Sequence, residues 1–280
     1  MTKDIKTIDS LDLDNLDEAA LMAMTGQGGA PQQSAGLPRL SINYETEDDA
    51  GNTLPRGSWR VMLDGQYLYT TELSFRPFAR MFNYSLWDSE EGKMTSQSIQ
   101  TPSLGDRFPD SSGSEKCGRL SKDDEAALDP ADPRALLSRE VVCNQIVYGT
   151  ISGDFKSADG TKVKVENEPI VAYFKKSGFR PVREAIDTIT RQKKLMAKTV
   201  LQLSTKKNKM GSVTFWTPTF AQVDYLDQLT SEDMGLLKKF METIKGYNDT
   251  ILAKYRDASK LLGSADSSSL DAELDDVDAA

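Results

Sequence analysis

The sequence contains no histidine, only two cysteines and no long apolar run, and each absence removes a class of function. Without histidine there is no Ser-His or Cys-His nucleophile pair, no imidazole base and no HExxH zinc motif. The two cysteines, Cys117 and Cys143, are too few for a zinc shell of three or four thiolates. No GxxxxGK[ST] loop is present either. We therefore expect a protein that is not an enzyme and that needs neither cofactor nor metal.

The absence of an apolar segment also bears on location. A membrane-spanning helix needs about 18 or more apolar residues, and the chain has no such run. Its acidic N-terminal stretch lacks the apolar core of a secretion signal. We expect a cytoplasmic protein with free thiols and no membrane partner.

Charge is distributed unevenly along the chain. The net charge of the 280 residues is -9, yet the segment 175–209 holds eleven lysines and arginines against two acidic residues. Segregation of this kind usually marks a binding surface accompanied by acidic appendages. The basic segment is therefore the first candidate for contact with an anionic partner.

Strand and turn signals predict a mainly β fold with helical additions (α+β). Strands are expected at 58–63, 67–73, 74–87, 93–100, 141–152, 162–165, 169–174, 200–205 and 212–217, with a helix over 181–196. We expect an OB-like β-barrel, a long C-terminal helix and a disordered acidic tail. The predicted N-terminal part is a flexible arm at 1–36 with a short helix at 15–24. An OB-like domain follows at 37–227, with a long loop at 102–138. The C-terminal part is predicted to be an amphipathic helix at 228–263, ended by Gly263, and an acidic tail at 264–280.

The strand FRPFARMFNYSLW (75–87) has an unusual alternation. One face carries Arg76, Phe78, Arg80, Phe82 and Tyr84. Arginines beside aromatic rings could bind phosphates and stack on the bases of a single strand. The alternative is that the rings belong to the core and the arginines extend outward from it. The strand alone leaves both interpretations open.

The hairpin LSTKKNKMGSVTFWTP adds a second basic and aromatic segment. Lys206, Lys207 and Lys209 lie at its turn, and alternation places Trp216 on the face opposite Val213 and Phe215. An exposed tryptophan beside lysines suits base stacking. A solvated turn with Trp216 at a seam of the barrel is the alternative.

The segment YFKKSGFRPVR (173–183) is the third. It presents Lys175, Lys176, Phe179 and Arg180 where a strand meets a helix that Pro181 begins. Backbone N–H groups at a helix start favour phosphate. A solvated helix face is the simpler alternative for this segment taken alone.

Five stretches together suggest a family: 37–59 (LPRLSINYETEDDAGNTLPRGSW), 141–153, 168–182, 206–218 and the acidic tail from Ser264. In their pattern the chain resembles the single-stranded DNA-binding proteins of tailed bacteriophages, which join an OB-type barrel to an acidic tail. The resemblance implies a protein that coats and protects single-stranded DNA during viral DNA replication, recombination and repair in the infected bacterial host. It also implies that the tail recruits a phage DNA polymerase, helicase or recombination proteins. The tail acids are Asp271, Glu273, Asp275, Asp276 and Asp278.

A protein of a different class remains the alternative. A virion structural or assembly protein could use the same aromatic face to pack on a protein partner. Quenching of tryptophan fluorescence by oligo-dT, weakened by salt, would distinguish DNA binding from such packing. The oligomeric state stays open at this point.

Overall fold

The computed structural model describes residues 36–275, with side chains up to Leu261. The chain divides into two units, Met1–Leu37 and Pro38–Ala280, and all elements named below belong to the second. The helix predicted at 15–24 and the tail residues Asp276 and Asp278 lie outside the described residues.

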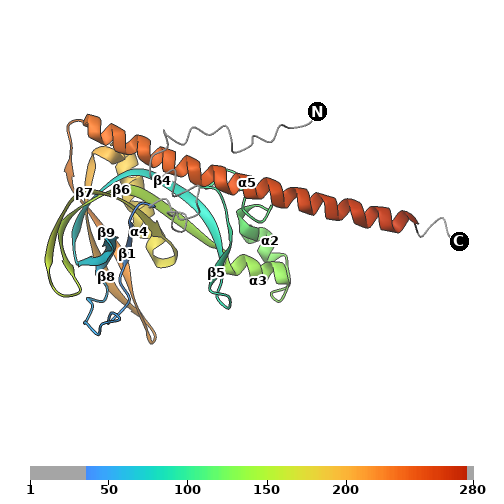
Figure 1. Ribbon diagram of the computed structural model, residues 1–280, viewed down its shortest axis with the longest axis horizontal. Coiled ribbons are helices and arrows are strands. Elements are labelled where there is room, and N and C mark those ends of the chain that lie inside the picture. The colour runs from blue at the N-terminus through green and yellow to red at the C-terminus, as the bar shows by residue number, and fades with distance from the viewer. Residues whose placement is uncertain (1–35, 276–280) are drawn as a thin grey trace, which may run out of the picture. The chain divides into compact units, whose positions relative to one another are not determined.

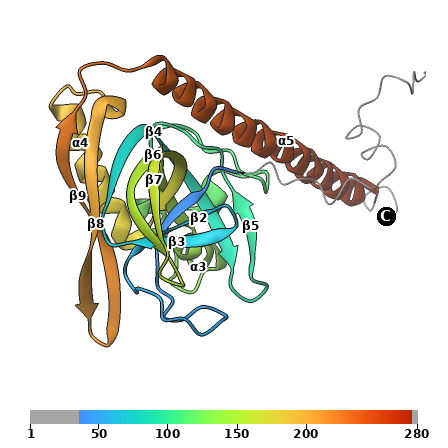
Figure 2. The same ribbon diagram turned by 60° about the vertical axis from the view of Figure 1, so that its left-hand side comes forward.

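A nine-stranded sheet dominates the second unit, which confirms the mainly β class (Figures 1 and 2). The strands are β1 (Arg39–Ile42), β2 (Trp59–Leu63), β3 (Gln66–Thr70), β4 (Leu73–Asp88), β5 (Lys93–Gln97), β6 (Val142–Ser157), β7 (Lys162–Phe174), β8 (Thr199–Met210) and β9 (Val213–Tyr225). Their order is β3-β2-β1-β7-β6-β4-β8-β9, with β5 paired to β4 and a further pairing between β3 and β6. The pairing of β1 with β7 is parallel and the others are antiparallel.

The main core lies between these strands and one helix. Phe75, Ile151 and Phe155 are fully buried in it. The helices are η3 (Lys116–Gly118), α2 (Lys122–Ala126), α3 (Pro133–Glu140), η4 (Lys176–Gly178), α4 (Phe179–Arg191), η5 (Met196–Lys198) and α5 (Ser231–Asp275). On α4 the apolar residues Val182, Ile186 and Ile189 recur at helical spacing and are buried against this core. Burial of each such side chain contributes about 1.5–3 kcal/mol.

Helix α5 packs along β4, as Figure 1 shows, through the apolar stripe that the sequence predicts. Phe240 on this stripe is fully buried and meets Phe78 edge-on, with 5.6 Å between ring centroids. Thr230 and Asp233, which have the sequence spacing of a capping pair, cap the start of the helix: the Asp233 N–H donates to Thr230 Oγ1 at 3.1 Å and the Thr230 N–H donates to Asp233 Oδ2 at 2.9 Å. Burial alone would raise the pKa of Asp233, but the hydrogen bonds from Thr230 and Arg76 outweigh it and lower the pKa.

The predicted end of this helix at Gly263 is wrong, because α5 continues through Asp275. One glycine costs a helix only about 1 kcal/mol relative to alanine, so it is a weak stop signal, although many of the residues that follow it are serines and aspartates, which are only moderate helix formers. Asp271, Glu273 and Asp275 therefore belong to a helix and not to a disordered tail. No helix within residues 36–275 has an apolar stretch long enough to cross a bilayer.

The long loop predicted at 102–138 has internal structure organised around a buried carboxylate. Asp110 is fully buried and accepts hydrogen bonds from the Cys117 N–H at 2.7 Å and from the Ser114 hydroxyl at 2.7 Å. Burial would raise the pKa of Asp110, but these bonds and those from Ser112 outweigh it, so the pKa is lowered. Short helices α2 and α3 follow, where the sequence predicted a loop.

Several strands also differ from prediction. The strands expected at 162–165 and 169–174 are one strand, β7, because a bulge between Ile151 and Gly153 of β6 keeps the two strands paired across the irregular stretch. Strands β8 and β9 are longer than expected and form a hairpin that pairs from Thr199–Tyr225 to Met210–Val213.

Candidate nucleic-acid interface

The stacking surface predicted on strand 75–87 is not exposed. Phe78 and Phe82 are only 5% and 4% exposed. Phe78 packs on Phe240 of α5, and Phe82 packs on Phe179 of α4 with ring centroids 6.1 Å apart. The prediction that these two rings face solvent is wrong, and the core interpretation holds because the two helices cover this face of β4.

The arginines of the same strand are already neutralised. Arg76 bonds to Asp233 at 2.8 Å and to the carbonyl of Ala197, and Arg80 bonds to Asp187 at 2.8 Å. Tyr84 is half-buried, and burial raises its pKa to about 12. A phosphate would have to displace a carboxylate to reach either arginine, so β4 is a poor track for nucleic acid.

Aromatic rings and free cations do converge elsewhere, around Trp216 on β9. The half-buried Trp216 ring meets Tyr44 edge-on at 5.8 Å, and the Tyr44 hydroxyl donates to the Trp216 carbonyl at 3.3 Å. The guanidinium of Arg56 lies 5.2 Å from the centroid of the indole, and Nζ of Lys207 lies 5.9 Å from it. Tyr44 is 49% exposed, so both rings border solvent.

Local backbone geometry explains how this arrangement forms. The pairing of β8 with β9 sets Lys207 opposite Trp216, on the same face as the core pair Leu203 and Phe220. Trp216 therefore lies on the core-facing side of the hairpin, at the point where the side chains on that side become exposed to solvent. This corrects the prediction that it lies on the face opposite the core.

Gly57 allows the indole to approach the backbone. Its φ is +85°, and a Cβ at this position would lie 2.1 Å from Trp216 Nε1. Any side chain here would therefore collide with the ring as well as strain the backbone. The glycine is required by this contact.

A pocket of about 180 Å³ adjoins Trp216 and has more aromatic and cationic walls. Arg39 of β1 lies 4.7 Å from the centroid of the Tyr173 ring, and Lys175 follows one residue after β7. Burial, together with the nearby charges of Arg39 and Lys176, lowers the pKa of Lys175. Arg39 and Lys176 are thus close enough to Lys175 to contribute to this shift, after burial. We call the pocket with its rim the Trp216 groove, which comprises the rings of Tyr44, Tyr173 and Trp216 and the cations Arg39, Arg56, Lys175, Lys176 and Lys207.

None of these five cations has a carboxylate within 4.0 Å of its charged nitrogens in the part of the chain that the structure describes. Arg180, which was predicted to bind phosphate, is instead bonded to Glu184 at 2.6 Å. The groove thus combines unpaired positive charge with flat apolar rings. An anion with unsaturated rings is the ligand that such a surface suits.

The predicted site residues are therefore divided. Lys175, Lys176, Lys207 and Trp216 come together at the groove. Lys209 shares the hairpin face of Lys207 nearer the tip, whereas Lys206 lies on the opposite face. Phe179 packs on the core ring Phe82 and does not face the groove opening.

Four groove residues escaped sequence analysis: Arg39, Tyr44, Arg56 and Tyr173. Each of the four is a basic or aromatic residue close to the end of a strand, and this is the pattern that could have marked it as a candidate. Nothing local shows that the segments meet, because β1 pairs with β7 in parallel and Tyr44 contacts Trp216 across 172 positions.

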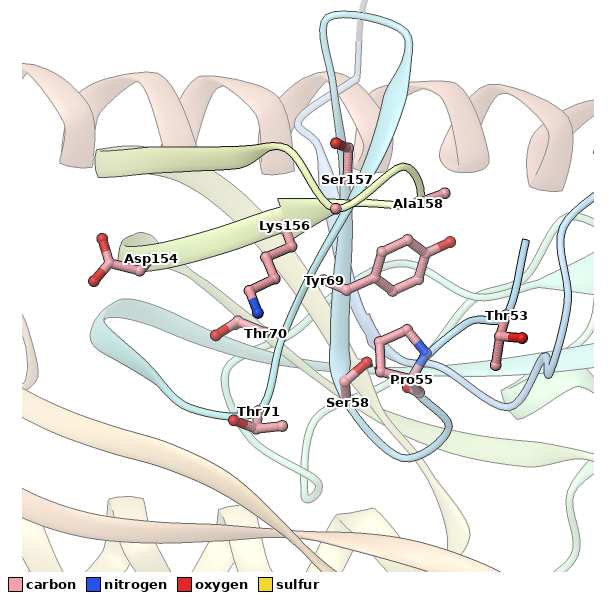
Figure 3. A pocket seen from close by; sticks show the side chains of 11 residues that line it. Thr53, Pro55, Ser58, Tyr69, Thr70, Thr71, Asp154, Lys156, Ser157 and Ala158 are labelled. Atoms are coloured by element: carbon pink, nitrogen blue, oxygen red, sulfur yellow. Dashed lines mark hydrogen bonds between the residues drawn. The ribbon is translucent and has the colours of Figure 1, made fainter.

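A second pocket, of about 360 Å³, lies at the turn between β6 and β7 (Figure 3). Hydroxyl groups of Thr53, Tyr69 and Ser157 contribute to its lining, and Figure 3 shows Lys156 near Thr70. Asp154 also lines it, so the one lysine is offset by one carboxylate. This pocket lacks the excess positive charge of the Trp216 groove.

Cys117 and Cys143 are free, and burial raises the pKa of the Cys117 thiol to about 12, which leaves it unreactive near neutral pH. Among the side chains described, which end at Leu261, no group of three or more cysteine, aspartate or glutamate residues is placed to hold a metal ion. Comparison of the chain with family models, curated proteins and solved structures gives no match.

Proposed function

We propose that the protein binds single-stranded DNA in the Trp216 groove with little sequence preference. The observation that carries this proposal is that five cations, none of which has a carboxylate partner among the described residues, lie near three partly exposed rings. Lysine and arginine bind successive phosphates, and tryptophan and tyrosine stack on bases, which is how sequence-tolerant single-strand binding works. Each stacked base contributes about 1–3 kcal/mol.

Single strands suit the groove better than duplex DNA for a geometric reason. The rings need the flat face of a base, and base pairing in a duplex leaves only the base edges accessible. A protein that binds unpaired bases through Trp216 and Tyr44 would shift hairpins toward the melted state by mass action.

One feature of the strand pairing supports a barrel as part of the proposal. Strand β3 pairs with β6 and β1 pairs with β7, so β1, β2, β3, β6 and β7 form a cycle in which each strand pairs with two others. The strands of this cycle follow chain order and β7 runs parallel to β1, and both features differ from a Greek key.

The cellular role that we propose is coating of viral single-stranded DNA during replication, recombination and repair in the host cytoplasm. The acids Asp271, Glu273 and Asp275 at the end of α5 would then contact a polymerase, helicase or recombination protein through a basic patch of that partner.

Binding of fluorescein-labelled oligo-dT, measured by anisotropy at low and high salt, tests the proposal. We expect binding at low salt that weakens as salt rises, and at least a tenfold loss for Lys175→Glu, since a repulsive charge replaces an attractive one. Lys239→Glu on α5 is the matched control, because Lys239 is exposed and lies outside the groove. Absence of oligo-dT binding at low salt would refute the proposal.

One observation favours the assembly protein as the second candidate. At the tip of the β8–β9 hairpin, Met210 and Val213 face each other across the strands and are 72% and 57% exposed. An exposed apolar pair suits a protein neighbour. Under this second function, Met210→Lys with Val213→Lys would abolish assembly, and Lys175→Glu would leave it intact.

A further inference from the structure

A trough runs between α4 and β9, which lie side by side, and adjoins the Trp216 groove (Figure 2). It has a volume of about 480 Å³ and is lined mainly by residues within 181–189 of α4 and 217–222 of β9. Pro218 lines both the trough and the pocket beside Trp216, so the two hollows meet at this residue. Gly178, just before α4, lies beside Pro218, and the N–H of Leu195, after α4, donates to the Tyr225 hydroxyl at 3.4 Å. The trough therefore leads from the Trp216 groove to the far ends of α4 and β9.

A second group of cations lies at that far end, around Tyr225. Nζ of Lys194 and Nζ of Lys198 lie 5.3 Å and 5.2 Å from the centroid of the Tyr225 ring. Lys193 is exposed and has a φ of 55° just after α4, a backbone position where glycine is the usual residue. A third lysine thus stands here against the conformational preference of the backbone. We call Lys193, Lys194 and Lys198 with Tyr225 the Tyr225 cluster.

The Tyr225 cluster has an excess of positive charge. None of its three lysines has a carboxylate within 4.0 Å of Nζ among the described side chains, and Arg191, at the end of α4, has none near its guanidinium either. Two acids flank the tyrosine. Asp224 accepts the N–H of the next residue at 2.7 Å, and Asp227 offers its backbone carbonyl to Lys198. Four cations therefore outnumber two acids, and the surplus is available to an anion.

We propose that a single strand held in the Trp216 groove continues along the trough between α4 and β9, and that its next phosphates bind the lysines of the Tyr225 cluster. This inference rests on the proposed function and adds to it the path of the strand. Tyr225 follows Trp216 by nine positions of β9, which is about 30 Å at roughly 3.3 Å per residue. Glu184 in the trough wall is already bonded to Arg180 at 2.6 Å, and the threonines of the wall can donate hydroxyl protons to phosphates. Because two ammonium groups already lie against the Tyr225 ring, this ring holds the lysines in place and does not stack on a base.

The test follows the binding of oligo-dT over lengths of about 4–16 nucleotides, the range of site sizes for single OB domains. Four nucleotides cover only about 14 Å at the spacing of a duplex strand, whereas sixteen cover about 54 Å, so the longer strand can reach from the groove to the cluster. Lys193→Gln with Lys194→Gln removes two cluster lysines. This variant should bind dT16 about tenfold more weakly at about 50 mM salt, with a salt slope shallower by about 1.4, and should keep the wild-type affinity for the shortest oligonucleotides.

Lys122→Gln with Lys239→Gln is the matched control, because these exposed lysines on α2 and α5 lie away from the trough, and it should bind every length as the wild type does. Lys175→Glu in the groove should weaken short and long oligonucleotides alike. An equal loss for short and long strands in the cluster variant would mean that its lysines act on the groove or on the fold. Unchanged dT16 affinity would mean that the strand takes another path. Either result overturns the inference, whereas failure of the wild-type protein to bind any oligonucleotide at low salt refutes the proposed function itself.

Discussion

The salt dependence of single-strand binding can be calculated from the groove. The logarithm of the affinity falls with the logarithm of salt concentration by about 0.7 for each single-strand phosphate that a cation neutralises. Five cations in the Trp216 groove have no carboxylate partner among the described residues. If each meets one phosphate, the slope is about -3.5, and affinity falls about 100-fold between 50 and 200 mM salt.

Neutralising two of these cations gives a defined change in the slope. Lys175→Gln with Lys207→Gln leaves three cations, so the slope becomes about -2.1 and the same increase in salt costs only about 20-fold. Both lysines are exposed and neither forms an ion pair within the described residues, so the fold should be unaffected. The variant binds more weakly at low salt, yet its affinity approaches that of the wild type at high salt.

Fluorescence anisotropy of labelled oligo-dT over a salt series measures both slopes. The matched control is Lys239→Gln with Lys122→Gln, two exposed lysines on α5 and α2 that lie away from the groove. The control should retain the wild-type slope. An unchanged slope in the Lys175 and Lys207 variant would show that the phosphates lie elsewhere, and the reasoning from unpaired charge would fail.

Four further outcomes follow from individual contacts. Trp216→Ala removes a stacking ring and should weaken oligo-dT binding by about 1–3 kcal/mol in an anisotropy titration at a temperature where the variant is folded. Gly57→Ala places a methyl group where the indole lies, so the ring must move, and the tryptophan emission and oligo-dT affinity should both change. Asp233→Asn leaves Arg76 without its carboxylate and should cost about 3 kcal/mol in denaturant unfolding. Because folding lowers the pKa of Asp233, this carboxylate contributes fully to the free energy of unfolding above its unfolded pKa, near 4, and the contribution is lost as pH falls through the folded pKa. In acid the wild type should therefore lose this part of its stability, whereas Asp233→Asn, which lacks the carboxylate, should not. Asp110→Asn should cost about 2 kcal/mol and speed hydrogen exchange at the Cys117 amide, whereas unchanged exchange would contradict the role of this carboxylate in organising its loop.

Local pattern was sufficient for elements whose faces are set by their own sequence. The stripe at Val182, Ile186 and Ile189 predicts α4 because helical spacing of apolar residues needs no distant partner to be recognised. The pairing of Thr230 with Asp233 likewise predicts the start of α5. The end of α5 was missed because one glycine, which costs a helix only about 1 kcal/mol relative to alanine, is a weak stop signal.

Strand 75–87 shows where local pattern is insufficient. Alternation separates its two faces but does not say which of them another element covers. Phe78 is buried by Phe240, a residue far along the chain on α5, and Phe82 is buried by Phe179. The choice between core and stacking surface therefore depends on long-range packing that no window of the sequence contains.

The distinction between paired and unpaired cations has the same origin. The basic segment 175–209 contains two acids, Glu184 and Asp187, and both pair with arginines of α4 within one helical turn. Asp187 also reaches Arg80, a partner 107 positions away, and so neutralises a residue of the predicted stacking strand. The lysines that flank the helix have no acid at that spacing. The lysines that form no ion pair on α4 therefore lie just after β7 and along the β8–β9 hairpin. Together with Arg39 and Arg56 on the other side of the groove, these lysines are available to bind a phosphate backbone.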